Sequence, residues 1–211
     1  MMKEVFMKEI KYHSLSNEVK YLIHKDARLE KLFKMKEEII VNINENYFES
    51  LAGVIVAQQL SSKVASVIYN RLSNLLKGNI TPEYIKNADE VELRGIGLSY
   101  QKIKYLKSLA DCVLTKEVDL SDLNHLSDKD IIEMLVKIKG IGIWSAQMFL
   151  MFSLGREDVF SVLDLGLRNA LKKLYELPNL TNQEIEEMSL NWSPYRSIVS
   201  HFLWHAWDSQ I

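Results

Sequence analysis

Residues 135–146 read LVKIKGIGIWSA, a segment in which a Gly-x-Gly turn separates two apolar runs. Apolar residues recur at helical spacing on both sides, so the pattern predicts an αα-hairpin over about residues 128–153. The glycines Gly140 and Gly142 allow positive φ and let a ligand approach the backbone without meeting a Cβ atom. The first N–H groups of the second helix would lie at the positive end of its dipole, a position that suits a phosphate.

Two interpretations of this turn stay open from the residues alone. A Gly-x-Gly turn is usually a tight connection with a glycine C-cap and holds no ligand. Lys137 and Lys139, which lie beside the turn, favour a phosphate ligand instead. Contacts of this kind would hold a nucleic-acid strand without reading its sequence.

The rest of the chain has the same helical periodicity, and we predict an all-α protein. Ser16, one of the two serines 61 and 62, and Thr81 followed by Pro82 are expected to begin helices as caps. The helices are expected at residues 16–23, 47–59, 62–76, from 81, 101–114, 128–138, 143–153, 165–175 and 194–207.

The composition narrows the class of protein further. The chain has 211 residues and only three prolines and eight glycines, which argues against a many-stranded β architecture. Its single cysteine, Cys112, excludes a disulfide framework, a Cys-rich zinc site and a four-cysteine iron–sulfur cluster. No apolar run approaches the roughly 20 residues that cross a bilayer, so we expect an intracellular protein without a membrane partner. The net charge of −2 argues against a general polycation but allows a locally basic face.

Asp164 is the acidic residue whose setting suggests chemistry. It lies between apolar neighbours and directly before a predicted helix, where an aspartate usually serves as an N-cap. The capping and chemical interpretations are compatible, because a capping carboxylate stays ionised. In a partly dry environment it can then stabilise a developing positive charge.

Several segments of the chain resemble the helix-hairpin-helix (HhH-GPD) DNA glycosylases of the endonuclease III superfamily and occur in the same order as in that family. Within the family, the chain looks most like the 3-methyladenine DNA glycosylase II branch. The matching segments cover roughly residues 20–208: IVAQQLS at 55–61 with Lys63 and Ala65, Gly97-Leu98-Ser99 with Lys102, the hairpin 135–146, VFSVLD at 159–164, and WSPYRS at 192–197 leading to Trp204.

The resemblance implies two helical subdomains that flank a DNA-binding cleft, with a helix-hairpin-helix motif at about residues 128–153. We expect residues 1–211 to form a single glycosylase unit. Residues 1–20 would be peripheral, with no room before residue 20 for the additional β-domain of some members. The implied partner is damaged double-stranded DNA, and we expect a cytoplasmic monomer, associated with the nucleoid if the source is bacterial.

The resemblance also assigns roles to individual residues. Asp164 matches the catalytic aspartate, and the aromatic positions of the base pocket match Trp144 and Trp204, with Met148 where one relative has a tyrosine. Phosphate binding falls to the hairpin, through Lys139, Gly140, Gly142 and the N–H groups near Ser145. The loop that enters the duplex matches Gln58, Gln59, Leu60 and Ser61, with Gln59 as the wedge and Leu60 as the alternative. The hairpin carbonyls that would bind a structural Na⁺ or K⁺ are those of Val136, Ile138 and Ile141.

Two differences from other members define the expected chemistry. Trp144 occupies the place of the lysine that forms a Schiff base in members that also cut the strand. The expected reaction is therefore hydrolysis of the N-glycosidic bond alone, with no cofactor in catalysis, on flipped-out alkylated purines of the 3-methyladenine and 7-methylguanine type. Ser161 and Leu163 also depart from the family pattern, in place of a frequent proline and an acidic residue.

Other interpretations remain at this stage. The chain could be a glycosylase for deaminated or oxidised bases, or a damaged-DNA-binding protein without catalysis. Trp204 could be a core residue, and Gln58 and Gln59 could simply end a helix at the surface. His201 and His205 are spaced to share a metal but have no third ligand nearby. A path for DNA phosphates would explain the positions of three lysines, and a solvated helix face explains them equally well. These lysines are Lys102, Lys104 and Lys107.

Overall fold

The computed structural model describes residues 8–209, except for the side chain of Ser62. The described chain is mostly helical, as predicted, and falls into two compact units. We call residues 44–149 the central unit, and residues 1–43 with 150–211, as far as they are described, the split unit. No helix of the described part is long and apolar enough to cross a membrane.

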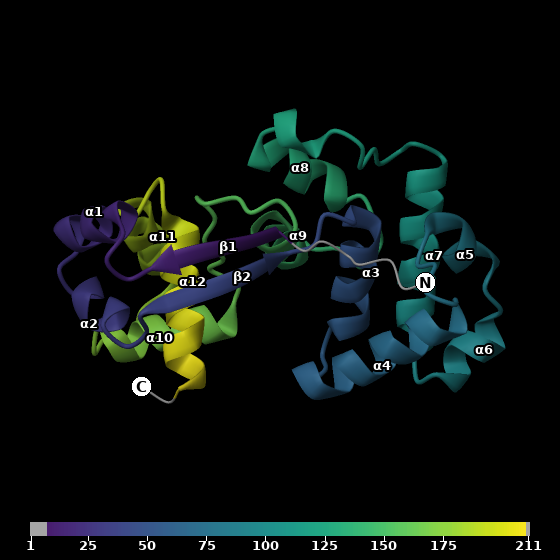
Figure 1. Cartoon of the computed structure of the whole chain (residues 1–211), viewed down its shortest axis with the longest axis horizontal. Helices are drawn as coiled ribbons and strands as arrows, with labels where there is room; N and C mark the ends of the chain where they lie inside the picture. Colours follow the sequence, from purple (N-terminus) through teal and green to yellow (C-terminus); the bar gives the residue numbers. More distant parts are fainter. Residues whose placement is uncertain (1–7, 210–211) are drawn as a thin grey trace. The chain divides into compact units, whose positions relative to one another are not determined.

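The central unit is entirely helical (Figure 1). Helix α7 packs against α3, α5 and α6, and α3 packs against α4. Buried leucine and isoleucine side chains of α3 and α7 form much of its core. The elements are α3 (Tyr47–Ala57), α4 (Ser62–Leu75), α5 (Pro82–Asn87), α6 (Glu90–Gly95), α7 (Tyr100–Leu114), the 3₁₀ turn η1 (Leu123–His125), α8 (Asp128–Leu135) and most of α9 (Ile143–Phe152).

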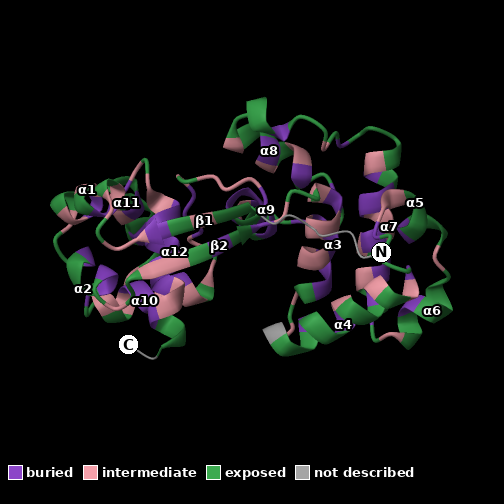
Figure 2. Ribbon diagram, in the orientation of Figure 1, coloured by how far each residue is buried: buried purple, intermediate pink, exposed green. Residues whose placement is uncertain are grey.

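The described part of the split unit contains the end of α9, one small sheet and five helices, two from the start of the chain and three from its end. Helix α12 packs against α10 and α2, with the rings of Phe33 and Phe202 4.9 Å apart. Figure 2 shows buried positions along α12, which lies at the core of this unit. The elements are β1 (Lys8–His13), α1 (Asn17–Lys25), α2 (Leu29–Phe33), β2 (Glu38–Ile43), α10 (Leu165–Leu174), α11 (Asn182–Leu190) and α12 (Arg196–Asp208).

The sheet corrects the prediction that every element is helical. Strands β1 and β2 pair antiparallel, with Ile10 opposite Val41 and Tyr12 opposite Ile39. The β-branched run in β2 fits a pleated surface better than a helix, and pairing buries Tyr12 and Val41 in the core. The expectation that residues 1–20 are peripheral is therefore wrong for residues 8–20, and residues 1–7 lie outside the described part.

An N-cap side chain fixes the start of each of three predicted helices. The side chains of Ser16, Ser61 and Thr81 each accept a hydrogen bond from the backbone three residues on, which confirms Ser16 and Thr81 and selects Ser61 over Ser62. Helix α8 ends at Leu135, three residues before the predicted end, and the chain enters the hairpin turn there.

The start of α12 is fixed to the segment that follows α9. Arg196 forms a two-pronged ion pair with Asp158, with Nε 2.7 Å and Nη2 3.1 Å from the carboxylate oxygens. Ser197 accepts from the N–H of Val159 at 3.0 Å and donates to the carbonyl of Arg156 at 2.7 Å. These contacts set the position of α12 relative to the segment that leads to Asp164.

The Asp158–Arg196 pair predicts a pH-dependent contribution to stability. Burial alone would raise the pKa of Asp158, but hydrogen bonds from Arg196 and Ser193 outweigh it, and the pKa lies below its ordinary value. A carboxyl with a lowered pKa in the folded state stabilises the protein above its unfolded pKa, and this is lost as pH falls through the folded pKa. We expect Asp158→Asn to lower the free energy of unfolding by about 1–3 kcal/mol at pH 7.

Urea unfolding of both proteins at pH 7 and near pH 3 measures this effect. The difference between the wild type and Asp158→Asn should shrink on acidification, because protonation removes the wild-type ion pair. A difference that stays constant with pH would show that the pair does not carry the effect.

Candidate active site

The hairpin turn between α8 and α9 has the geometry that its glycines suggest. Gly140 has φ +91°, and a Cβ atom there would lie 2.2 Å from the ring of Tyr105. A Cβ atom on Gly142 would meet nothing within 4 Å, so the backbone is open to a ligand at that position. The carbonyl of Gly142 accepts the N–H of Ala146 at 3.0 Å, which makes Gly142 the residue before the first turn of α9.

The other predicted hairpin residues surround this helix start. Lys139 is exposed beside the turn, whereas the side chain of Ser145 is buried in the first turn of α9. A helix of this length presents unpaired N–H groups and a partial positive charge at its beginning. The turn therefore offers backbone donors to an anion, and an exposed lysine lies beside it in the chain.

The three carbonyls predicted to bind a cation belong to the same turn, at Val136, Ile138 and Ile141. The carbonyl of Ile138 also accepts the N–H of Ile141 at 3.0 Å, and a carbonyl oxygen has a second lone pair. Neutral oxygen donors suit a hard cation. The described residues contain no cluster of three His, Cys, Asp or Glu side chains that would hold a metal.

The loop between α3 and α4 is fastened to the hairpin. The side-chain amide of Gln58 donates to the carbonyl of Gly140 at 2.7 Å, and Lys102 donates to the carbonyl of Val56 at 2.8 Å. Gln59 follows with φ +57° and an exposed side chain. Gln58 is thus held against the protein, and Gln59 is the residue that projects.

The other two predicted residues of this loop are Leu60 and Ser61. Leu60 is half-buried, which makes it a poorer wedge than Gln59. Ser61 caps α4 by accepting the N–H of Val64 at 3.4 Å, so its hydroxyl already has a structural role.

Lys102 and Lys107 of α7 bind backbone carbonyls, a role that neither a phosphate path nor a solvated helix face includes. Lys107 donates to the carbonyls of Lys86 and Ala88 at the end of α5, and Lys102 binds the last turn of α3. Burial lowers the pKa of Lys102. Both ammonium groups therefore satisfy helix C-termini, where a positive charge is favourable.

Asp164 is the N-cap of α10, as predicted. Its Oδ1 accepts the N–H of Leu167 at 2.9 Å and also the indole N–H of Trp204 at 3.0 Å. The neighbouring Leu163 and Leu165 are 50% and 62% exposed. The carboxylate is thus oriented by two donors and lies between apolar side chains on the surface.

Trp204 belongs to an aromatic cluster that the sequence analysis did not assemble. Its ring lies 5.7 Å from that of Phe152 and 5.6 Å from His201, and His201 stacks on Tyr12 at 5.5 Å. Burial lowers the pKa of His201 to about 4, so the imidazole is neutral near pH 7. The signal available for Phe152 was its position four residues after Met148, one helical turn further along the chain. Nothing in the sequence indicated Tyr12.

Trp144 and Met148 lie one turn apart on α9, in the central unit. Trp144 is 37% exposed, and Met148 is buried. An indole offers a flat face on which a planar ligand can stack, while Met148 contributes to the core. Asp164 and Trp204, by contrast, belong to the split unit.

A helical chain with a glycine hairpin, a projecting glutamine loop and an oriented capping carboxylate defines a class of DNA-repair protein. Residues 52–194 match the family described as "HhH-GPD superfamily base excision DNA repair protein". The chain belongs to that family, which confirms the resemblance seen in the sequence.

Several named proteins are similar to this chain in sequence or in structure. DNA-3-methyladenine glycosylase 1 of Schizosaccharomyces pombe is 35% identical over 161 residues, covering 74% of this chain and 71% of that protein. The crystal structure of a DNA-3-methyladenine glycosidase from Bacillus halodurans has a TM-score of 0.84 at 36% identity, covering 94% of this chain and 92% of that one. A Schizosaccharomyces pombe 3-methyladenine DNA glycosylase in complex with abasic DNA has a TM-score of 0.81 at 31% identity, with 90% and 96% coverage.

Proposed function

We propose that this protein is a monofunctional DNA glycosylase that flips alkylated purines out of duplex DNA and hydrolyses their N-glycosidic bond. The observation that carries the proposal is Asp164, an N-cap carboxylate of an HhH-GPD chain whose oxygen is held by the Trp204 indole. Its similarity to named 3-methyladenine glycosylases supports alkylated purines as the substrate.

The chemistry follows from the charge on the substrate. A purine alkylated at N3 or N7 is cationic and leaves as a neutral base, so no acid is needed to protonate it. Breaking the C1′–N bond leaves positive charge on the sugar, which the Asp164 carboxylate stabilises. Water then adds to C1′ and loses a proton, leaving an abasic site. A DNA strand that covers Leu163 and Leu165 would exclude water and strengthen this electrostatic effect.

The aromatic residues suit a cationic base. The exposed face of Trp144 and the ring of Trp204 are electron-rich surfaces that attract a positively charged ring. Trp144 also replaces the Schiff-base lysine, which supports hydrolysis without strand cleavage.

The hairpin is proposed to hold the DNA backbone. The open backbone at Gly142, the N–H groups near Ser145 and the charge of Lys139 suit a phosphate. A Na⁺ or K⁺ ion on the carbonyls of Val136, Ile138 and Ile141 would add to that attraction. Replacing both ions by a bulky organic cation at constant ionic strength should then weaken DNA binding.

Release of free base tests the proposed reaction. Duplexes that carry 3-methyladenine, 7-methylguanine, hypoxanthine or uracil are incubated with the protein, and free base and strand breaks are measured. We expect release of the methylpurines, with strands that break only after alkali. Release of uracil or hypoxanthine alone would indicate a glycosylase for deaminated bases, and DNA binding without release a non-catalytic protein.

Gln59 is expected to fill the gap that the flipped base leaves. Gln59→Ala should lower single-turnover excision from duplex DNA by about tenfold, because the flipped state loses one partner and the cost of unstacking stays. Excision at a mismatched lesion, where the base is already unstacked, should fall less. The control is Gln183→Ala, the same chemical change at an exposed position of α11. Equal losses on both substrates would show that Gln59 does not act on base flipping.

The proposed function also implies a binding partner and a location in the cell. The partner is damaged double-stranded DNA, and a protein with this substrate would act as a monomer in the cytoplasm, associated with the nucleoid if the source is bacterial.

A further inference from the structure

Two hydrogen bonds of Asp164 meet on one oxygen atom. Oδ1 takes the N–H of Leu167 at 2.9 Å, from its own helix, and the indole N–H of Trp204 at 3.0 Å, from a helix that begins 32 residues later in the chain (Arg196 against Asp164). A backbone donor alone would leave the carboxylate free to turn about its Cβ–Cγ bond. A second donor from another helix restricts that rotation, because turning would break one of the two bonds.

Trp204 is itself held in place by the aromatic cluster. Phe152 lies against one part of its ring and His201 against another, with centroids 5.7 Å and 5.6 Å away. His201 is stacked on Tyr12, which strand β1 supplies. The orientation of the indole N–H is therefore set by packing from β1, α9 and α12, and not by the hydrogen bond alone.

Gly166 gives an independent indication that this contact is tight. A Cβ atom on Gly166 would lie 3.2 Å from Oδ1 of Asp164 and 3.4 Å from Cδ1 of Trp204. Gly166 lies in the first turn of α10 and has an ordinary helical backbone, so alanine would be compatible with the helix itself. The space that glycine leaves open is the space that the Asp164–Trp204 pair occupies.

We propose that Trp204 is a positioning residue for the reaction, whose indole N–H fixes the rotamer of Asp164 toward the sugar. The proposal rests on the proposed glycosylase function and adds a second role for Trp204 besides contact with the base. The role belongs to the edge of the indole, whereas stacking on a base would use its face.

Trp204→Phe separates the two roles, because phenylalanine keeps an aromatic face and loses the donor. We expect the single-turnover rate of base release to fall by about 10- to 100-fold, with the affinity for DNA containing an abasic-site analogue within about twofold of wild type. The loss should be similar for 3-methyladenine and 7-methylguanine, since it acts on Asp164 and not on the base. Trp207→Phe, on the same helix and 39% exposed, is the matched control.

The double variant Asp164→Asn/Trp204→Phe tests whether the two residues act together. If Trp204 acts through Asp164, the double variant should be no slower than Asp164→Asn, because the group that Trp204 positions is already lost. Additive losses would overturn the proposal and leave Trp204 with a contact to the base only.

Gly166→Ala provides a second variant that disturbs the pair. Alanine favours a helix over glycine, and displacement of the capping carboxylate opposes this gain, so the melting temperature should change by only a few degrees. The added methyl group should displace the Asp164–Trp204 pair and lower the rate of base release by about tenfold. Full activity in Gly166→Ala, together with full activity in Trp204→Phe, would overturn the proposal.

The hydrogen bond can also be observed without activity. The protein has four tryptophans, so its indole ¹H–¹⁵N signals can be assigned by single substitutions. The signal lost in Trp204→Phe should shift in Asp164→Ala more than the other three. No shift would overturn the inference even in an active enzyme. An inactive wild type that shows the shift would contradict the proposed function and leave the contact established.

Discussion

Asp164→Asn should lower the release of 7-methylguanine by about a thousandfold, the largest effect expected of any single substitution in this protein. Asparagine caps a helix as well as aspartate does, and its side-chain oxygen can still accept from Leu167 and Trp204. The variant therefore keeps the fold and loses the negative charge. Single-turnover release of free base, with melting temperature and DNA affinity measured beside it, checks this result.

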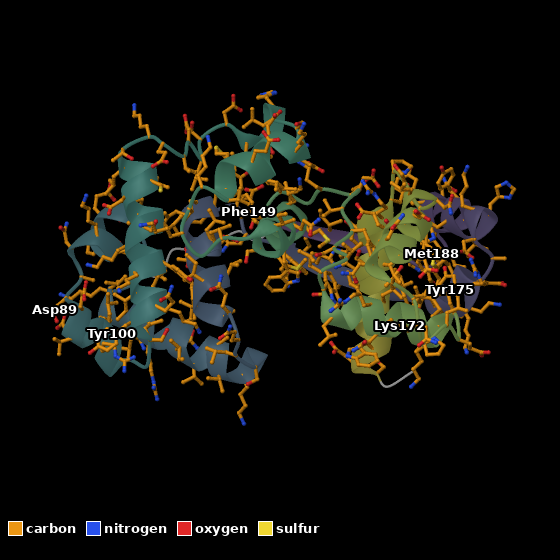
Figure 3. All side chains as sticks on the ribbon, turned by 180° about the vertical axis from the view of Figure 1, so that it is seen from behind. Asp89, Tyr100, Phe149, Lys172, Tyr175 and Met188 are labelled. Atoms are coloured by element: carbon orange, nitrogen blue, oxygen red, sulfur yellow. The ribbon has the colours of Figure 1, made fainter. Side chains whose placement is uncertain are left out.

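Asp89→Asn is the matched control for Asp164→Asn. Asp89 is the N-cap of α6, where its Oδ1 accepts from Val91 at 2.8 Å and from Glu92 at 3.1 Å (Figure 3). The same chemical change at another capping aspartate should leave base release unchanged. If Asp164→Asn kept wild-type activity, Asp164 would be a cap only and the catalytic assignment would be wrong.

The second large effect is expected at Gly140. Gly140→Ala places a methyl group 2.2 Å from the Tyr105 ring on a backbone with φ +91°. Overpacking and a left-handed backbone together should lower the free energy of unfolding by about 2–4 kcal/mol. Distortion of the turn should also weaken DNA binding by about tenfold, because its donors would no longer converge on one phosphate.

Gly78→Ala separates the two causes. Gly78 has a similar φ of +76°, but a Cβ atom there would meet nothing within 4 Å. It should therefore show only the backbone cost, about 1 kcal/mol, and unchanged DNA affinity. Urea unfolding and a DNA titration measure both quantities. Equal destabilisation in the two variants would mean that contact with Tyr105 does not explain the requirement for glycine at position 140.

The parts of the fold that the sequence predicts are those with local causes. The hairpin glycines, the serine and threonine caps and the position of Asp164 before α10 each depend on neighbouring residues. The sheet was missed because pairing joins Tyr12 to Ile39 across a helical segment, and neither strand is long enough to show a clear alternation.

The site shows the same division between local and distant causes. A sequence pattern selects the loop that contains Gln58 and Gln59, but only the bond to Gly140 and the φ of Gln59 decide which side chain projects. Lys102 and Lys107 are also explained only by carbonyls distant in sequence. The resemblance to the family predicts Trp204 as a pocket residue, whereas its bond to Asp164 requires the packing of α12.

The division of the chain into a central and a split unit affects the order in which the protein can form on the ribosome. Residues 44–149 are contiguous, so the hairpin proposed to bind DNA can fold while the rest is still being synthesised. The split unit joins Phe33 near the start to Phe202 near the end, and its core must wait for α12. A nascent chain would therefore acquire the hairpin turn before Asp164 gains the Trp204 donor.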